Sequence, residues 1–405
     1  MNDSIQKEFS KRPLFRFWPW LIVLLLLLFV GFIRVRLLDM PLERDEGEYA
    51  YAGQLLLQGI PPYELAYNMK LPGTYFAYAL GMALFGQTVA GIHLTLILVN
   101  SLTIIFVFLL ARKLFGTTAG LVAGSTFGIL SVSPAVLGMA AHANHFVILF
   151  AVPATLLLWQ AEESKQLRTL FWSGLLYGLA LLMKQQGICF CLFGGLFLVW
   201  NAIQNRSLVS LSFLKRILFF GLGIFLPVGL TCLFLAWTGV FSKFWFWTFT
   251  YASSYATGTT LPDGIGNFCD YVQKKGVVYS AFLALAIVGL PAAARNTAAH
   301  KQTIFTVAFL FFSFFGTAIG LYFREHYFIL LLPAFAVIAG LAVVSLQRVM
   351  KGKFLKIIPL FSYIAIFGWT IFRQEQFFFQ WPADAICQVV YFLEPFVGTP
   401  IVAKY

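Results

Sequence analysis

Long runs of apolar residues recur along this 405-residue chain, and they constrain its fold more than any other feature. A helix of about 20 apolar residues crosses the hydrocarbon core of a bilayer. Hydrophobic residues make up 60% of the chain and charged residues only 11%, against roughly 25% charged in a soluble domain. The chain is therefore predicted to be an all-α integral membrane protein with about eleven transmembrane helices, near residues 18–38, 89–110, 118–137, 145–160, 169–183, 187–203, 216–237, 277–293, 303–321, 327–346 and 354–372.

The distribution of charge over the loops tests this count, because each span reverses the side of the membrane. With the amino terminus inside, the inner segments hold 17 of the 28 basic residues and 4 of the 16 acidic ones. This asymmetry agrees with the positive-inside rule and gives the formal net charge of +12 an explanation that requires no nucleic acid. We predict that the protein lies in a bacterial inner or plasma membrane. Residues 1–17 are then a cytoplasmic amino terminus, and the acidic segments lie on the periplasmic or external face.

Two predicted outer loops, residues 39–88 and 238–276, are long enough to carry structure inside a polytopic domain that covers residues 18–372. The stretch "EGEYAYAGQLLLQG" has helical character and ends at Gly59, and "LPGTYFAYALGMALFG" is predicted to be a second, amphipathic helix at the membrane interface. Residues 373–405 are predicted to form a short external tail.

Three acidic residues, Asp45, Glu46 and Glu48, crowd into the start of the first outer loop. They could simply mark the solvated end of the first span. However, carboxylates this close repel one another, and partial burial raises the pKa of at least one, which suits a general base or a metal ligand. On a helix Asp45 and Glu48 share a face while Glu46 points away. The cluster is therefore a candidate catalytic site.

Basic residues on the same predicted side could bind the phosphate of a lipid-linked substrate. They are Lys70, Lys184 and Arg324, and His326 stands beside the last of them. Lysine binds phosphate as a point charge and arginine as a bidentate fork. The alternatives are that Lys184 snorkels from the end of a span and that Arg324 pairs with Glu325.

Other polar and aromatic residues on this side have simpler interpretations. His142 and His145 could be ligands or proton carriers, or ordinary interfacial residues. The aromatic stretch 244–258 is interpreted mainly as an interfacial belt that could also offer a stacking surface to a sugar.

The segment "RDEGEYAYAGQLLLQGIPPYELAYNMKLPGTYFAYALGMALFG" resembles the first outer loop of C-type (GT-C) glycosyltransferases of the protein O-mannosyltransferase and aminoarabinose lipid A transferase type, the glycosyltransferase family 39-like group. "YFREHYFILLLPAFAVIAG" is similar to a segment near the end of their membrane domains. Such proteins commonly continue into an external domain, so this chain resembles either a short member or an incomplete sequence.

The resemblance implies a sugar transfer from a polyprenyl-phosphate donor, with inversion, to a lipid, glycan or protein acceptor. It implies that Asp45 is the base or acceptor-orienting carboxylate, that Lys70 binds the donor phosphate, and that Glu46 assists by hydrogen bonding or in a metal site with Asp45. No cofactor is certain, but a divalent metal ion is one expectation. Some relatives have a carboxylate where this chain has Met69, which weakens the case for a metal at that place. Leu71 replaces a proline that is common in the family.

A transporter or flippase of lipid-linked sugars is the alternative function, with the carboxylates relaying protons. Transporters place charges near the middle of spans and often show repeated halves. Here the predicted spans are largely free of central charges, which favours the enzyme.

Overall fold

The computed structural model describes residues 13–383 and residue 386, and the regular elements in this part of the chain are all helical. The predicted all-α class is confirmed. Most of the predicted cytoplasmic segment 1–17 and of the predicted external tail 373–405 lies outside the described residues.

Nine helices within the described residues are long and apolar enough to cross a membrane. Two more predicted spans, near 118–137 and 169–183, correspond to shorter apolar helices, α6 (Thr117–Leu130) and α8 (Leu167–Met183). The predicted count of eleven is therefore not confirmed, although each predicted span coincides with a helix. Three of the nine include the 3₁₀ turn that precedes the α-helix: η2 (Gln185–Gly187) before α9, η4 (Thr297–Ala299) before α15 and η6 (Leu355–Ile357) before α17. The nine run through α2 (Pro13–Val35), α5 (Val89–Phe115), α7 (Ala143–Ser164), α9 (Ile188–Gln204), α10 (Leu211–Trp237), α14 (Val277–Ala294), α15 (His300–Ala318), α16 (Leu332–Val349) and α17 (Ile358–Arg373).

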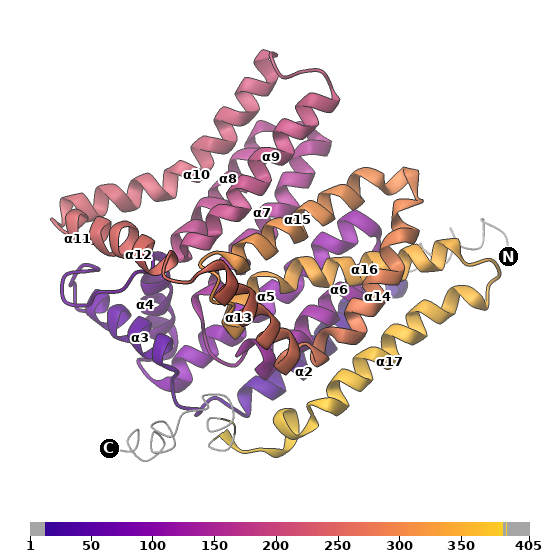
Figure 1. The fold of residues 1–405 in the computed structure, drawn as a ribbon, viewed down its shortest axis with the longest axis horizontal. Coiled ribbons are helices and arrows are strands. Elements are labelled where there is room, and N and C mark those ends of the chain that lie inside the picture. The colour runs from indigo at the N-terminus through magenta and orange to yellow at the C-terminus, as the bar shows by residue number, and fades with distance from the viewer. Residues whose placement is uncertain (1–12, 384–385, 387–405) are drawn as a thin grey trace.

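The two predicted outer loops fold into further helices, most of which lie together at the left of the view, at one end of the bundle (Figure 1). The first loop contains α3 (Arg44–Leu57) and α4 (Gly73–Phe85), which confirms the two predicted helices; α3 ends beside Gly59, whose φ is +80°. The second loop contains α11 (Phe241–Trp245), the π-helix η3 (Phe246–Tyr251), α12 (Ala252–Ala256) and α13 (Leu261–Lys275).

Glycines hold α8 against α10. A Cβ atom at Gly174 would collide with the carbonyl oxygen of Phe220, and one at Gly178 would collide with that of Ile224. Small residues four positions apart let helix backbones approach closely in a membrane, where van der Waals packing drives association. Because only 11% of α10 is buried inside the protein, this seam with α8 is its main attachment.

The predicted span 327–346 begins later than expected. Residues Glu325–Leu330 form the 3₁₀-helix η5, and α16 starts at Leu332 with Pro333 in its first turn. Proline is favoured there because the first turn needs no backbone donor. Arg324 and His326 lie outside the span, as predicted, at the end of the bundle where α3 and α4 lie.

Candidate active site

Asp45 sits in the first turn of α3, almost fully buried. The helix begins there because Glu43 and Glu46 form a capping box. The Glu43 carboxylate accepts a hydrogen bond from the backbone of the first turn, and the Glu46 carboxylate accepts the backbone N–H of Glu43. The Tyr49 hydroxyl donates a hydrogen bond of 3.4 Å to Asp45 Oδ2. The sequence prediction that Asp45 anchors a site is thus consistent with a carboxylate held in a fixed place.

Electrostatics keep Asp45 ionised. Burial raises the pKa of Asp45, but the positive charges of Lys70, His142, Lys184 and Arg44 lower it more, to about 2. The carboxylate is therefore negative at neutral pH and surrounded by groups from several distant segments.

Glu46 has a different environment from Asp45, although the two are adjacent. Its side chain is fully buried, and Oε1 accepts the N–H of Ala141 at 2.5 Å and lies 3.4 Å from His93 Nε2. Oε2 accepts the N–H of Glu43 at 2.9 Å. Burial raises the pKa of Glu46, but the nearby His93 imidazole and the hydrogen bonds from the backbone lower it more. Glu46 therefore joins the start of α3 to the loop that carries His142.

Glu48 is exposed and accepts a hydrogen bond from the Asn68 amide. Asn68 Oδ1 in turn accepts the N–H of Lys70 at 3.0 Å. Glu48 thus helps to order the loop that presents Lys70, and the structure does not bring its carboxylate as deep as that of Asp45.

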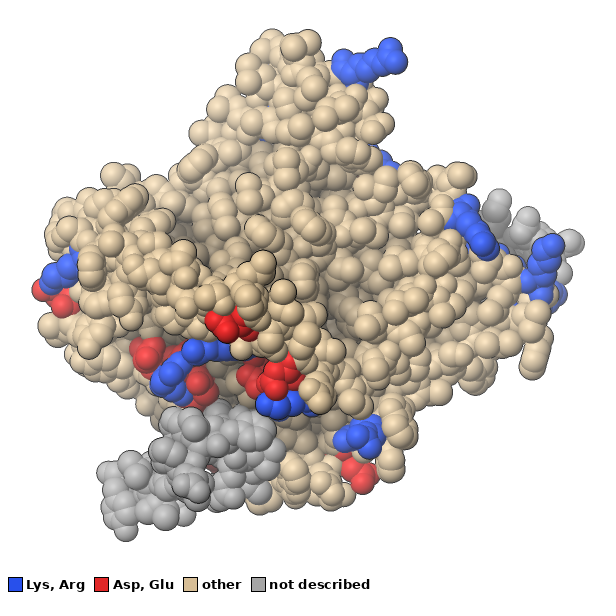
Figure 2. Space-filling model, viewed as in Figure 1, with Lys and Arg blue, Asp and Glu red and all other residues tan. Residues whose placement is uncertain are grey.

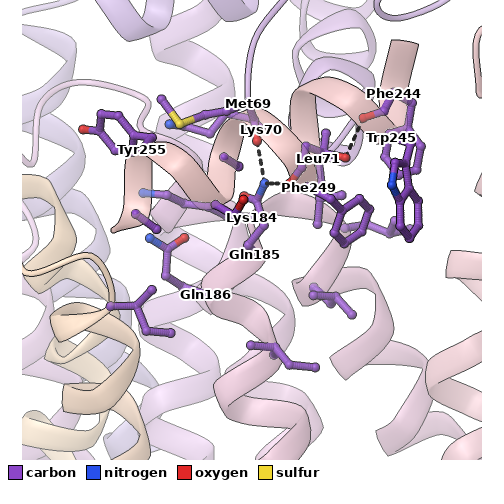
Figure 3. A pocket seen from close by; sticks show the side chains of 18 of the residues that line it. Met69, Lys70, Leu71, Lys184, Gln185, Gln186, Phe244, Trp245, Phe249 and Tyr255 are labelled. Carbon is purple, nitrogen blue, oxygen red and sulfur yellow. Dashed lines mark hydrogen bonds between the residues drawn. The ribbon is translucent and has the colours of Figure 1, made fainter. Parts of the chain in front are cut away.

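Lys70 and Lys184 line the same cavity, although 114 positions separate them in the chain (Figure 3). The Lys70 carbonyl accepts the hydroxyls of Tyr63 at 2.7 Å and Tyr75 at 3.4 Å. Thr74, at the start of α4, donates a 2.7 Å hydrogen bond to the carbonyl of Met183, the residue before Lys184. These bonds hold the start of α4 against the end of α8, which places the two lysines together.

Gly73 makes this approach feasible, so we expect Gly73→Ala to destabilise the site. A Cβ atom there would lie 2.5 Å from the carbonyl oxygen of Leu182, a backbone atom that cannot give way cheaply. We expect a loss of about 1–3 kcal/mol of unfolding free energy, seen as a lower Tm in detergent. Gly47→Ala in α3 is the matched control, because nothing lies within 4 Å of its Cβ position and alanine favours a helix. Equal melting temperatures for the two variants would contradict this account.

The cavity that the lysines line has a volume of about 620 Å³ and is otherwise mostly apolar (Figure 3). The Lys184 ammonium lies 4.3 Å from the centre of the Tyr327 ring, and burial holds the pKa of Lys184 well below its ordinary value. Gln185 donates hydrogen bonds to the carbonyls of Met69 and Thr248, which ties the cavity floor to the second outer loop. The apolar wall comes mainly from the segment α8 to α12 and from the end of α15, and it includes Ile188, Val228, Phe241, Phe244, Trp245, Phe249 and Ile319.

The aromatic stretch 244–258 therefore does more than the predicted interfacial belt. Phe244, Trp245, Phe249 and Tyr255 line the cavity directly. Sequence reasoning missed this role because a belt and a cavity wall have the same composition.

Arg324 and His326 approach the site from η5. Arg324 is half-buried over the Tyr322 ring, 5.6 Å from its centre, and its charge contributes to the lowered pKa values of Lys70 and Lys184. No ion pair joins Arg324 to Glu325 within the described residues. All four predicted phosphate-binding residues thus gather at one end of the bundle, with only Lys70 and Lys184 lining the cavity.

His142 and His326 stack at a ring distance of 4.2 Å, and His326 Nε2 lies 4.0 Å from Asp45 Oδ2. Ligand atoms of Asp45, His142 and His326 all lie within 4.8 Å of one another. Both ring nitrogens of His142 are buried without a hydrogen-bond partner. Two imidazoles and a carboxylate form a donor set that suits zinc, so these residues fit a divalent metal ion.

The structure thus groups Asp45 with two histidines and leaves Glu46, the other predicted candidate ligand, outside the group. His145, the other histidine of this turn, is buried in α7 and lies outside the group as well.

Comparisons with known proteins concern the fold that carries these residues. Residues 70–230 match the family model described as dolichyl-phosphate-mannose-protein mannosyltransferase. No curated protein matches the chain.

Among solved structures, the chain is similar to ArnT from Cupriavidus metallidurans bound to undecaprenyl phosphate, with a TM-score of 0.56 and 17% identity over 92% of this chain and 74% of ArnT. It is also similar to the oligosaccharyltransferase AglB from Archaeoglobus fulgidus in complex with an inhibitory peptide and a dolichol-phosphate, with a TM-score of 0.57 and 12% identity over 89% of this chain and 56% of AglB. The predicted GT-C fold is confirmed.

Proposed function

With the fold of the C-type membrane glycosyltransferases as its starting point, we propose that this chain transfers a sugar from a polyprenyl-phosphate donor to a lipid, glycan or protein acceptor on the outer face of the membrane. The observation that carries the proposal is the pair Lys70 and Lys184 at the polar end of a largely apolar cavity, with the Asp45 carboxylate in their field. A phosphate with an isoprenoid tail has this combination of charge and hydrocarbon.

The donor phosphate binds to Lys70 and Lys184, and the first isoprenoid units occupy the aromatic cavity. Arg324 lies close enough to influence both lysines and adds positive charge at the same end. Cations in a partly dry site interact with phosphate more strongly than they would in water. No nucleotide is needed, because the lipid phosphate is itself the leaving group.

The reaction follows from the position of Asp45. The acceptor hydroxyl or amine attacks the anomeric carbon from the face opposite the phosphate, so the new bond forms as the carbon–oxygen bond to phosphate breaks and the configuration inverts. Asp45 orients the acceptor and takes its proton. The electron pair leaves with the phosphate oxygen, and Lys70 and Lys184 stabilise its charge.

Asp45, His142 and His326 would hold a divalent ion beside the reacting groups. Such an ion supplies positive charge that stabilises anionic groups during the transfer. These side chains come from three separate segments, so the ion would also fix their positions.

We expect removal of this ion by a chelator to lower transfer by about 100-fold or more, with recovery on adding Zn²⁺ or Mn²⁺, because a catalytic metal contributes several kcal/mol. Elemental analysis provides an independent readout: His142→Ala should lose the metal, and His300→Ala, at an exposed histidine, should keep it. Chelation that leaves activity intact, in a protein without bound metal, would exclude this site.

The outer-face location rests on charge. Figure 2 shows acidic side chains together with basic ones over the left and lower parts of the view, where α3 and α4 lie, and only basic ones at the top and right edges. Basic loops stay in the cytoplasm. This separation supports an active site on the periplasmic or external face.

A flippase for the same lipid is disfavoured by the placement of buried charge. Within the described candidate spans, the buried charged residues are Arg34 and Glu162, both in the last turn of their helices. Proton-relaying transporters carry such groups nearer the centre of spans. The deciding experiment supplies a purified, reconstituted protein with a polyprenyl-phosphate sugar and measures both glycosylated product and lipid translocation; translocation without product would overturn the proposal.

A further inference from the structure

A second polar cavity, of about 430 Å³, lies at the opposite end of α8 from Lys184. It is lined where α7 and α9 end and where α8 and α10 begin. The 17 residues of α8 separate the two ends by about 25 Å, at 1.5 Å per residue. This cavity is therefore independent of the donor site.

Positive charge dominates the second cavity. Glu162 is buried and pairs with Lys165, with Arg216 at 2.7 Å and with Lys301 at 3.4 Å. Lys215 lines the cavity as well and makes no ion pair within the described residues. Among the described residues that line the cavity, one carboxylate is therefore set against three cations, Lys165, Lys215 and Arg216, which leaves a surplus of positive charge.

Arg216 is incompletely satisfied. Its Nη2 binds Glu162, but its Nη1 is buried with no hydrogen-bond partner. A buried donor without an acceptor costs about 1–3 kcal/mol. An anion in this cavity would supply the missing acceptor.

Backbone dipoles add to the attraction. Leu167 at the start of α8 and Ser212 at the start of α10 both line the cavity. The residue before α8, Gln166, makes no side-chain cap. The amino-terminal ends of helices carry partial positive charge and free N–H groups, which favour phosphate.

Exposed leucines stand beside the lining residues in the sequence. Leu208, Leu211 and Leu214 are exposed by 46%, 66% and 62%, and they neighbour the cationic lining residues Lys215 and Arg216 in the sequence. Exposed leucines beside a cluster of cations match a ligand with a phosphate and hydrocarbon chains.

We propose that this cavity binds the phosphate of an anionic membrane lipid, in the leaflet opposite to that of the donor site. The same phosphate chemistry could also be met by free inorganic phosphate, and the experiment separates the two sources. The proposal does not depend on the glycosyltransferase activity.

The test uses the full chain purified in detergent and titrates three probes: a short-chain phosphatidylglycerol, the corresponding phosphatidylcholine, and inorganic phosphate. Native mass spectrometry or thermophoresis gives the dissociation constants. Lys165→Gln/Lys215→Gln removes two lining cations, and Lys351→Gln/Lys353→Gln is the matched control for net charge on the same predicted side. Lys215→Gln alone leaves the Glu162 ion pairs intact, so it answers the objection that a variant has misfolded.

We expect saturable phosphatidylglycerol binding that weakens about fivefold in Lys215→Gln and about twentyfold in the double variant, with less than a twofold change in the control, since each cation near an anionic lipid contributes about a factor of five. Phosphatidylcholine should bind weakly. Binding of inorganic phosphate with the same dependence on Lys215 would support the phosphate site and identify the free ion as its source. Equal effects of the cavity and control variants would overturn the proposal, as would the absence of binding by any of the three probes.

Discussion

Asp45→Asn is expected to lower sugar transfer about a thousandfold, because removing a positioned acid–base group costs about 10²–10⁴ in rate. Asparagine keeps the size of the side chain and can still hydrogen-bond to Tyr49, but it cannot take a proton from the acceptor. Turnover should be measured with a purified, reconstituted protein and a polyprenyl-phosphate sugar. Donor affinity should change much less than turnover, because Lys70 and Lys184 line the cavity independently of Asp45.

Asp270→Asn provides the matched control for Asp45→Asn. Asp270 is an exposed residue of α13 that pairs with Lys274 at 2.8 Å, so its replacement should leave turnover within about twofold, as surface ion pairs contribute little. Full activity in Asp45→Asn would exclude Asp45 as the base. Equal losses in both variants would indicate a general effect of charge instead.

Lys184→Met is expected to lower kcat/KM for the lipid-linked donor about 100-fold, because one preorganised charge on a leaving phosphate contributes about 10²–10³. Methionine preserves the length and the contact with Tyr327. Lys184 is 3% exposed and forms no ion pair within the described residues, so the variant removes a desolvated cation. Its melting temperature should therefore stay unchanged or rise.

This combination of lower activity and undiminished stability separates a binding role from a structural one. Lys243→Met serves as the control, because Lys243 is half-exposed and pairs with Glu64 at 2.8 Å outside the cavity lining. Lys184→Met with wild-type kcat/KM would show that the lysine only snorkels at the end of a span, as the alternative interpretation of the sequence has it.

Hydropathy and charge predicted the helical membrane fold well, because both follow from the bilayer and hardly depend on which helices touch. The number of spans was harder to predict, because hydropathy does not show which helices touch one another. The helices α6 and α8 are short, and a short apolar helix can cross a membrane only when its neighbours accommodate it.

The site was predicted in part. Sequence placed Asp45, Lys70 and Lys184 on one side, but it could not show that Thr74 and Met183 hold the two lysine loops together. Likewise, helical spacing grouped Asp45 with Glu48 on one face of a helix. In the structure Asp45 is buried and Glu48 is exposed, because tertiary contacts cover only one end of that face.

Glu46 and the metal group depend on contacts between segments far apart in the sequence. Glu46 looks catalytic beside Asp45, and its partner Ala141 lies 95 positions away, beyond any local pattern. The residues of the candidate metal group, Asp45, His142 and His326, come from three segments with no ligand spacing in common. Their association depends on the fold alone.

The cavity that Lys70 and Lys184 line has walls that are mostly apolar, and Asp45 is not among its lining residues. Under the proposed function, the lipid carrier would be recognised in this cavity and the sugar nearer Asp45, so the two kinds of recognition would be separable. A protein organised in this way can change the sugar that it transfers through substitutions in its outer loops, while the carrier-binding part stays constant. Such modularity would let one membrane scaffold serve many surface polymers built on a shared lipid.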